Sequence, residues 1–360
     1  MQRRDPDDQQ GWGDVPTSAL EHPYVRLLQV LAFALVVFLG LNQLGLLDDT
    51  PDALRTTRIT GEDPVSAAAS VARQSHGGGA PTVVLAGIDA LADGVVATGL
   101  AGAVGAPILL NESGGLNPQT RDVLRELDTE RVFLIGGTNA LSADVARVLE
   151  EDLDLEVVRV AGGSRFDTAS RVADLVAAET EPAEIDGLRS ALVVPAEDVA
   201  AALEAGSIAA SRATPMPVLI SQGGRLPEPT VAAIERLGIE QLVVVAGTGA
   251  GAGAVEQDFD GPVRVVEGVN GAADLAIDIR DFRPPRAVVV PAGDQARTLI
   301  AGPLAGRESG VILTADTAQS WLAENCGTLG ELFVVGEEDE VTDAQVEAAE
   351  IAATDCGEDA

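Results

Sequence analysis

The stretch RVFLIGG at residues 131–137 is a short, continuously apolar run with β-branched residues that ends in two glycines. Similar runs recur as QLVVVAG at 241–247 and ELFVVGE at 331–337. Runs of this kind are typical of strands buried on both faces of a parallel sheet that helices cover. The sequence therefore predicts an α/β fold in which the same kind of strand occurs three times.

The residues around these runs repeat as well. Each copy opens with an arginine shortly before a glycine, and it continues with a helical run, a strand, an Ala-rich helical stretch, a second strand, another helix, the third strand and a last helix. The spacing between the first two arginines is 159 − 58 = 101 residues, and the next spacing is 264 − 159 = 105. We predict three tandem Rossmann-like parallel-sheet modules, at residues 57–157, 158–262 and 263–356, joined by right-handed crossovers and packed as one body because the junctions are short.

Residues 27–47, LLQVLAFALVVFLGLNQLGLL, contain no charged residue. About 20 apolar residues span a bilayer as a helix, and this run shows no polar face at helical spacing. It is also longer than the apolar core of a cleavable signal peptide. We therefore predict one uncleaved transmembrane signal-anchor helix at 27–47 after a disordered cytoplasmic tail at 1–26. The arginines around the span favour a C-terminal region outside the cell, and a buried core helix is the alternative.

The chain is strongly acidic, with 57 acidic and 23 basic residues and a formal net charge of −34. All of its basic residues are arginines. Such a charge repels nucleic acid, so the sequence excludes a non-specific nucleic-acid-binding protein. A solvated acidic surface suits strong salt, where screening removes the self-repulsion of the carboxylates. A composition bias from a GC-rich genome explains the same pattern.

The sequence offers no catalytic constellation. His22 and His76 are its two histidines, and they cannot supply a His metal site or a Ser-His-Asp set. Residues 247–252 fit the nucleotide-binding pattern G-x-G-x-x-A, but the Gly-rich stretch that follows is a poor helix former. Trp321 is the one Trp or Tyr after the predicted span, which disfavours an aromatic platform for neutral glycans. We expect a non-enzymatic protein with no cofactor and no metal site, and a nucleotide-using enzyme is the least favoured alternative.

Residues 131–172 resemble the cell-wall-binding repeat 2 family of Gram-positive bacteria. The matching features are a strand that ends in Gly-Gly, an Ala-Leu-Ser before a helix, and then the pattern R-x-x-G-x-x-R-aromatic-x-T-A that begins at Arg159 and includes Arg165. Family members usually carry three tandem copies. The resemblance covers about residues 57–356, and it is closest in the first copy and weakest in the third.

This resemblance implies modules that pack as a pseudo-threefold body and hold surface proteins non-covalently on anionic secondary polymers of the wall. It associates the PILL strand of the first copy with attachment, whereas the second copy matches that strand in part and the third has lost its proline. The resulting polymer-binding candidates are the arginines and the residues of this strand: Arg58, Arg159, Arg165, Arg264, Pro107, Ile108, Leu109 and Leu110.

The chemistry of these residues leaves two interpretations open. An arginine holds phosphate or carboxylate through a planar fork of donors, and a helix N-terminus nearby adds positive charge. Alternatively, each arginine ties its own turn by bonding backbone carbonyls or a neighbouring carboxylate. The strand at 107–110 is either part of a binding motif or simply a buried strand.

Cys326 and Cys356 each end a helix that flanks the strand at 331–335. Both helices finish at the same edge of the sheet, so a disulfide can join them in an oxidising compartment, with two unpaired thiols as the alternative.

Together these observations predict a cell-membrane, single-pass, exported protein that binds a secondary polymer or peptidoglycan of the wall. The alternative is an extracytoplasmic interaction or sensor domain that uses the same fold for a protein partner.

Overall fold

A computed structural model describes residues 54–245, 252–267, 270–280, 283–307 and 309–356. The predicted cytoplasmic tail at 1–26 and the predicted span at 27–47 lie outside these residues. Within the described ranges, no helix combines the length and the apolar character that crossing a bilayer requires. The transmembrane helix therefore stays a prediction.

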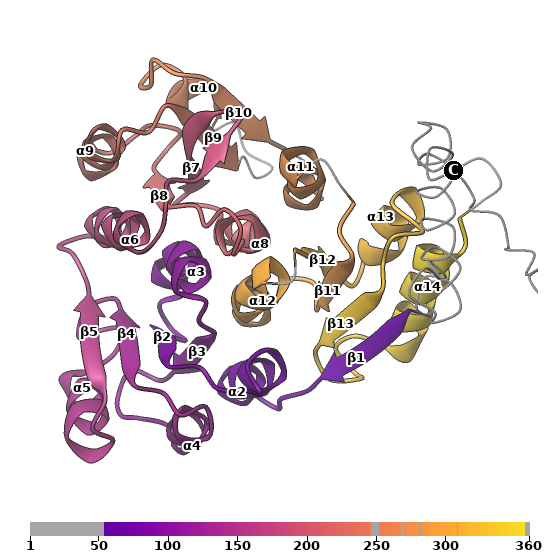
Figure 1. The fold of residues 1–360 in the computed structure, drawn as a ribbon, viewed down its shortest axis with the longest axis horizontal. Helices are drawn as coiled ribbons and strands as arrows, with labels where there is room; N and C mark the ends of the chain where they lie inside the picture. The colour runs from indigo at the N-terminus through magenta and orange to yellow at the C-terminus, as the bar shows by residue number, and fades with distance from the viewer. Residues whose placement is uncertain (1–53, 246–251, 268–269, 281–282, 308, 357–360) are drawn as a thin grey trace, which may run out of the picture. The chain divides into compact units, whose positions relative to one another are not determined.

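The described residues form three sheets whose strands run parallel (Figure 1). The first has the order β3(Ile108–Asn111), β2(Thr82–Gly87), β4(Arg131–Ile135) and β5(Glu156–Val160). The second contains β8(Val218–Ser221), β7(Leu188–Pro195), β9(Gln241–Val245) and β10(Val263–Val266), with the short antiparallel strand β6(Glu184–Ile185) against β7. The third has the order β1(Arg55–Ile59), β13(Glu331–Val335), β11(Arg286–Val290) and β12(Val311–Thr314). The α/β class with parallel sheets is thus confirmed.

The strand that opens each sequence copy completes the sheet of the preceding copy. β5 pairs with β4, β10 pairs with β9, and β1 pairs with β13 in a register from Arg55↔Glu331 to Ile59↔Val335. The borders of the sheets are consequently shifted by one strand from the predicted repeat borders, and residue 158 falls inside β5. β1, the first strand among the described residues, thus completes the third sheet.

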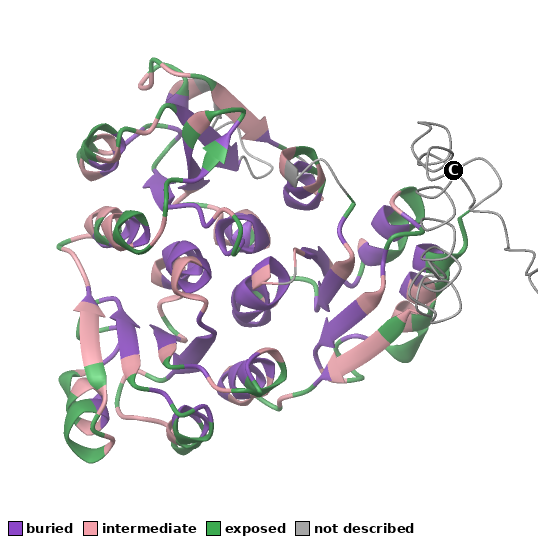
Figure 2. Ribbon diagram, in the orientation of Figure 1, coloured by how far each residue is buried: buried purple, intermediate pink, exposed green. Residues whose placement is uncertain are grey.

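Helices cover both faces of the sheets, and the continuous strands are buried between them (Figure 2). In the first module α3 lies on the side toward the other sheets, whereas α4 and α5 lie on the outer side (Figure 1). The helices of the first copy are α2(Pro64–Ser75), α3(Leu91–Val104), α4(Pro118–Glu126) and α5(Ala143–Arg147), which a π-helix at Val148–Asp152 extends. The others are α6(Arg165–Glu179), α7(Val199–Glu204), α8(Gly206–Ala209), α9(Glu228–Leu237), α10(Ala252–Val255), α11(Gly271–Arg280), α12(Gln295–Arg307), α13(Ala318–Glu324) and α14(Asp343–Thr354).

One helix from each copy reaches the centre, where α3, α8 and α12 contact one another (Figure 1). Small residues lie at their closest contacts. A Cβ added to Gly206 would lie 3.4 Å from Thr98 Cγ2 and 3.5 Å from Gly302 Cα, and one added to Gly306 would lie 2.4 Å from Ala210 O. Larger side chains would force the helices apart. Equivalent positions of the three copies therefore meet along one pseudo-threefold axis.

A second set of helices joins neighbouring modules. α6 packs on β8 and on α3, α2 packs on β3 and on α12, and α11 packs on β12 and on α8. Each of these helices follows an opening strand of a copy, so three equivalent junctions arise. We call them the first junction (first and second copies), the second junction (second and third copies) and the third junction (third and first copies).

In the third module, α13 and α14 carry the cysteines at their ends. Cys326 and Cys356 form a disulfide with their Cα atoms 5.5 Å apart. This is the pairing that the sequence analysis expected.

Candidate functional site

Arg159 lies at the edge of the first sheet, on β5, and its guanidinium is committed to the backbone. It donates to the carbonyl oxygens of Gly136 (3.1 Å) and Ser142 (3.1 Å), on the loop after β4. Burial lowers the pKa of Arg159. The side chain therefore ties its turn, as the second interpretation of the sequence proposed.

The equivalent arginines of the other copies are also engaged by groups of their own chain. Arg58 donates to the carbonyl oxygens of Gly336 (3.2 Å) and Glu337 (3.3 Å), and its Nη2 lies 3.0 Å from Asp343 Oδ1. Arg264 forms ion pairs with Asp278 (2.8 Å) and Asp186 (3.0 Å). These arginines hold their modules together, and their guanidinium donors are largely occupied by the chain itself.

The PILL segment is part of the core. Pro107 is buried, and Ile108, Leu109 and Leu110 on β3 are at most 1% exposed. Side chains buried to this extent do not reach a polymer outside the protein. Any contribution of this strand to binding must come from the shape that it gives the module.

Asn111, which sequence reasoning passed over, follows the PILL residues and is fully buried. Its amide nitrogen donates to the carbonyl oxygens of Glu112 (2.6 Å) and Gly115 (2.8 Å), and its oxygen accepts from Asn117 N (2.8 Å). One side chain thereby organises the loop after β3. The signal in the sequence is a polar residue at the end of a strand that is otherwise entirely apolar.

Arg165 differs from the other candidate arginines because its side chain is exposed. It is the first residue of α6, a helix of 15 residues whose N-cap is Ser164. Among the residues that the structure describes, no hydrogen bond or ion pair engages it. Its guanidinium therefore remains available to a ligand.

Arg165 borders a small hollow at the first junction, with an enclosed volume of about 10 Å³. We call this hollow the first-junction groove. One wall comes from α3 with Ala92 and Val95, and the other comes from the end of β7 and from α7 of the second copy, with Pro195 and Val199. The groove thus combines an apolar floor with one open cationic side chain at its border.

Asp93, on α3, is the carboxylate that Arg165 faces. Burial raises the pKa of Asp93, and the charge of Arg165 lowers it. A Cβ on Gly136 would lie 3.0 Å from Asp93 Oδ2, and Gly136 has a φ of 95°. The Gly-Gly turn after β4 is required at this position both for its left-handed backbone and for the space that Asp93 takes.

The third junction carries the opposite charge at the position of Asp93. Counting from the meeting point of Thr98, Gly206 and Gly302, the equivalents of Asp93 are Ala201 and Arg297. Arg297 is buried, and its guanidinium lies 2.6 Å from Asp294 Oδ2, 2.9 Å from Glu340 Oε2 and 2.8 Å from Gly61 O. Pro64 stands where Arg165 stands in the first junction. This junction is closed by the protein's own ion pairs.

The second junction is acidic. Burial and the charges of Asp198 and Asp316 raise the pKa of Glu204 to about 7. The helix α11 begins at Gly271, so no arginine stands at the place of Arg165. Of the three junctions, the first is the one with an open guanidinium among the residues described.

The nucleotide-binding pattern falls mostly at residues 247–251, outside the described residues. The helix that follows, α10, has four residues. Within the described ranges, no group of His, Cys, Asp and Glu side chains is arranged to hold a metal ion.

Comparison with known proteins now assigns the first copy. Residues 58–146 match the model of the family described as cell wall binding domain 2, CWB2. These residues belong to the CWB2 family. The resemblance to this family is thereby confirmed, and CWB2 units are cell wall binding domains.

A relative with a curated description is the N-acetylmuramoyl-L-alanine amidase LytC of Bacillus subtilis (strain 168), which is 30% identical over 245 residues. The match covers 67% of this chain and 45% of the amidase, so this chain spans less than half of that relative. Two solved structures share the fold. Cwp6 from Clostridium difficile has a TM-score of 0.73 at 18% identity over 84% of this chain and 48% of its own. Cwp8 from the same organism has a TM-score of 0.67 at 22% identity over 83% and 52%.

Proposed function

We propose that this CWB2 protein binds an anionic secondary polymer of the cell wall non-covalently, and that Arg165 at the first-junction groove makes the decisive contact. The observation that carries this proposal is the contrast among the candidate arginines. Arg58, Arg159 and Arg264 are engaged by carbonyls and carboxylates of their own chain, whereas Arg165 is exposed at the border of a hollow. A guanidinium with free donors can form paired hydrogen bonds with a phosphate or carboxylate.

The position of Arg165 supports an anionic ligand further. It begins a long helix, and the N-terminal end of a helix carries partial positive charge. The apolar walls with Ala92, Pro195 and Val199 exclude water from one side of the site and strengthen a charged contact there. Asp93 offsets part of the charge, so recognition acts at short range.

The net charge of −34 sets the conditions for binding. An acidic body and an anionic polymer repel each other at long range, and salt screens this repulsion beyond about 10 Å. Binding is therefore expected to improve as salt or Ca²⁺ rises.

The proposal includes the location of the protein. Residues 27–47 form an uncleaved signal anchor, and the three copies at 57–157, 158–262 and 263–356 lie outside the membrane and face the wall. The support is the uncharged apolar run, together with the CWB2 match at the first copy. The protein then bridges membrane and wall without transforming the polymer.

The remaining candidates serve this site indirectly. The buried strand Pro107–Leu110 fixes the shape of the first module, and Arg159 fixes the turn that carries Gly136 beside Asp93. We assign them a positioning role rather than contact with the polymer.

The test is cosedimentation of the full-length protein, in detergent, with purified wall sacculi before and after the secondary polymers are stripped. Arg165→Gln should lower the pelleted fraction, whereas Arg125→Gln, at another exposed arginine whose side chain makes no hydrogen bond or ion pair among the described residues, should leave it unchanged. Pelleting that survives stripping would assign peptidoglycan as the ligand instead. No pelleting at all would favour the alternative, a protein partner for the same fold.

A further inference from the structure

A polar hollow lies at the third junction, between the end of β1 and the helix α2. We call it the third-junction hollow, and its lining consists of Arg58, Ile59, Thr60, Ser70, Arg73 and Gln74. It is open to solvent and offers about 330 Å³, whereas the first-junction groove encloses about 10 Å³ by the same measure. Sites for small molecules occupy about 300–1,000 Å³. Of the two, the third-junction hollow is the one with room for a sugar ring.

A difference between the copies keeps this hollow open. Ser70 stands six residues after Pro64, which begins α2, and Arg171 stands six residues after Arg165, which begins α6. At the first junction the guanidinium of Arg171 donates to the carbonyl oxygen of Ala161, just after β5. This side chain crosses the space between helix and strand. The hydroxyl of Ser70 is too short to do the same, so the space at the third junction stays free.

The charges at the hollow are balanced by the chain itself. Arg58 forms an ion pair with Asp343 at 3.0 Å. Arg73 donates to both carboxylate oxygens of Glu126, at 2.5 Å from Nε and 3.3 Å from Nη2, and this hydrogen bonding lowers the pKa of Glu126. Each guanidinium that lines the hollow therefore has a carboxylate of its own, and the site does not select an anion by charge.

Neutral hydrogen-bonding groups supply the rest of the polar lining. The hydroxyls of Thr60 and Ser70 and the amide of Gln74 make no hydrogen bond with any residue that the structure describes. A hydroxyl both donates and accepts, and an amide offers a donor and an acceptor side by side. The hydroxyls of a sugar have the same double capacity. The lining residues include no aromatic side chain, so recognition here relies on hydrogen bonds rather than on stacking.

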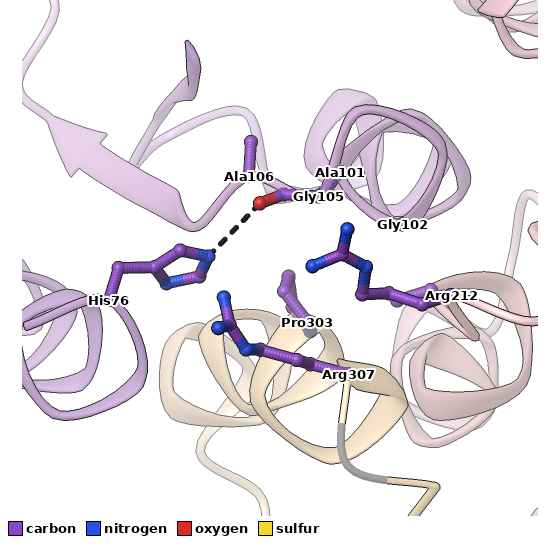
Figure 3. Close-up of a pocket in the computed structure, with 9 residues that line it drawn as sticks. His76, Ala101, Gly102, Gly105, Ala106, Arg212, Pro303 and Arg307 are labelled. Carbon is purple, nitrogen blue, oxygen red and sulfur yellow. Dashed lines mark hydrogen bonds between the residues drawn. The ribbon is translucent and has the colours of Figure 1, made fainter. Parts of the chain in front are cut away.

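The helix that forms one wall is fixed at both ends. At its beginning, Asp63 Oδ1 accepts from Val65 N (2.9 Å) and Ser66 N (2.8 Å). Just after its end, the buried ring of His76 places Nε2 3.1 Å from the carbonyl oxygen of Gly105 (Figure 3). The pocket around this ring encloses only about 10 Å³ and has no room for a sugar. The wall of the hollow is thus preformed, which lowers the cost of ordering it around a ligand.

We propose that the third-junction hollow binds a neutral sugar unit of the wall polymer through hydrogen bonds with Ser70, Arg73 and Gln74. This inference rests on the proposed function, in which Arg165 holds an anionic group of the same polymer. The hollow adds a second contact that recognises the glycan itself. Two contacts on one polymer raise the affinity together. The acidic body of the protein does not oppose the second contact, because the sugar carries no charge.

The variants for the test come from the protein's own first junction. Ser70→Arg introduces the residue found at the equivalent position 171, and it should fill the hollow. Gln74→Leu introduces the residue found at position 175, and it removes the amide. The matched control is Gln119→Arg, at an exposed position on α4 outside the lining, because it adds the same charge as Ser70→Arg.

The probe is the neutral glycan fraction that hydrofluoric acid releases from sacculi, separated from charged fragments by anion exchange. Saturation-transfer NMR measures its binding to the full-length protein in a detergent without a sugar head group. The wild type, Gln119→Arg and Arg165→Gln should bind it equally. Ser70→Arg should lose about tenfold in affinity and Gln74→Leu severalfold, as expected for one or two lost hydrogen bonds.

Cosedimentation with intact sacculi gives a second readout. Ser70→Arg should lower the affinity by the same factor at low and high ionic strength, whereas the loss in Arg165→Gln should shrink as salt screens its charged contact. Gln74→Leu, at an exposed residue, keeps the test decisive if Ser70→Arg is unstable.

Three results would overturn the inference: a neutral fraction that does not bind the wild type, equal binding to the wild type and to both hollow variants, or binding that only Arg165→Gln abolishes. Sacculus binding that Arg165→Gln leaves unchanged would instead overturn the proposed function. The two failures are therefore distinguishable.

Discussion

The first and third junctions place opposite charges at the same position of the same fold. In the first junction Asp93 stands on the central helix and faces Arg165, which stays exposed beside a groove. In the third junction Arg297 stands on the central helix and is enclosed by Asp294, Glu340 and the carbonyl of Gly61. One arrangement leaves a cationic group for a ligand, and the other uses its cation to hold two modules together. Repeated architecture therefore does not imply repeated binding.

The largest expected effect is on the closed junction. Arg297→Ala removes the cation from two partly buried carboxylates and leaves Gly61 O without its donor. Breaking a buried ion pair on one side costs about 3–5 kcal/mol. We expect a loss of about 3 kcal/mol in the free energy of unfolding, measured by urea titration. Arg165→Ala should change it by less than about 0.5 kcal/mol, since exposed substitutions have small effects. Similar losses in the two variants would erase the contrast between the junctions.

Glu204, at the second junction, should make the stability of the protein depend on pH. The direction is opposite to that of a carboxylate in a stabilising ion pair. The folded protein holds a proton on Glu204 up to a pH of about 7, whereas an unfolded chain releases it near 4.5. The unfolded state then binds fewer protons in this window, so stability falls as the pH rises from 4.5 through 7. Glu204→Gln should stabilise the protein at pH 8 by about 1–2 kcal/mol, after allowance for solvent screening. Thermal unfolding of both proteins at pH 5 and pH 8 measures this, and an unchanged pH slope would contradict it.

The roles of Arg159 and Arg165 can be distinguished by measuring both the free energy of unfolding and sacculus binding. Arg159→Gln removes hydrogen bonds to Gly136 O and Ser142 O and should lower the free energy of unfolding by about 1 kcal/mol. Its effect on sacculus binding should be smaller than that of Arg165→Gln, because Arg159 positions the turn and does not contact the polymer. Unfolding and cosedimentation of the same two samples give both values. A larger binding defect in Arg159→Gln would indicate that Arg159, and not Arg165, contacts the polymer.

The smallest expected effect concerns salt. Because long-range repulsion opposes binding, the affinity of the protein for sacculi should rise severalfold between low and high ionic strength. Cosedimentation at several salt concentrations measures how the pelleted fraction depends on ionic strength. A monotonic loss of binding with salt would show that long-range attraction dominates, and it would point to a cationic surface that the first-junction groove does not provide.

Much of the fold could be predicted because its signals are local. A run such as RVFLIGG at 131–137 marks a buried parallel strand by composition alone, and three similar runs predict three sheets. The sheet to which each of the strands β1, β5 and β10 belongs could not be predicted in the same way. These strands pair with the preceding copy, and the pairing depends on long-range register that no local pattern records.

The candidate site was predicted only in part. Arg165 was identified through its place in a motif, whereas Asp93 was not named because its approach to Arg165 depends on the packing of α3 against α6. Arg297 was missed for the same reason, since its equivalence to Asp93 follows from the meeting of the central helices. The roles of Arg58, Arg159 and Arg264 stayed open in the sequence because donors can serve a turn or a ligand equally well.

The pairing of β1 with β13 also orders events during synthesis. Arg55 meets Glu331, so 331 − 55 = 276 residues separate the two ends of this register. At about 5–20 residues per second, the ribosome needs roughly 15–50 seconds to supply the second strand after the first. β1, the first described strand to emerge, is thus among the last to find its partner, and a nascent chain that stops before β13 leaves β1 open to any other unpaired edge.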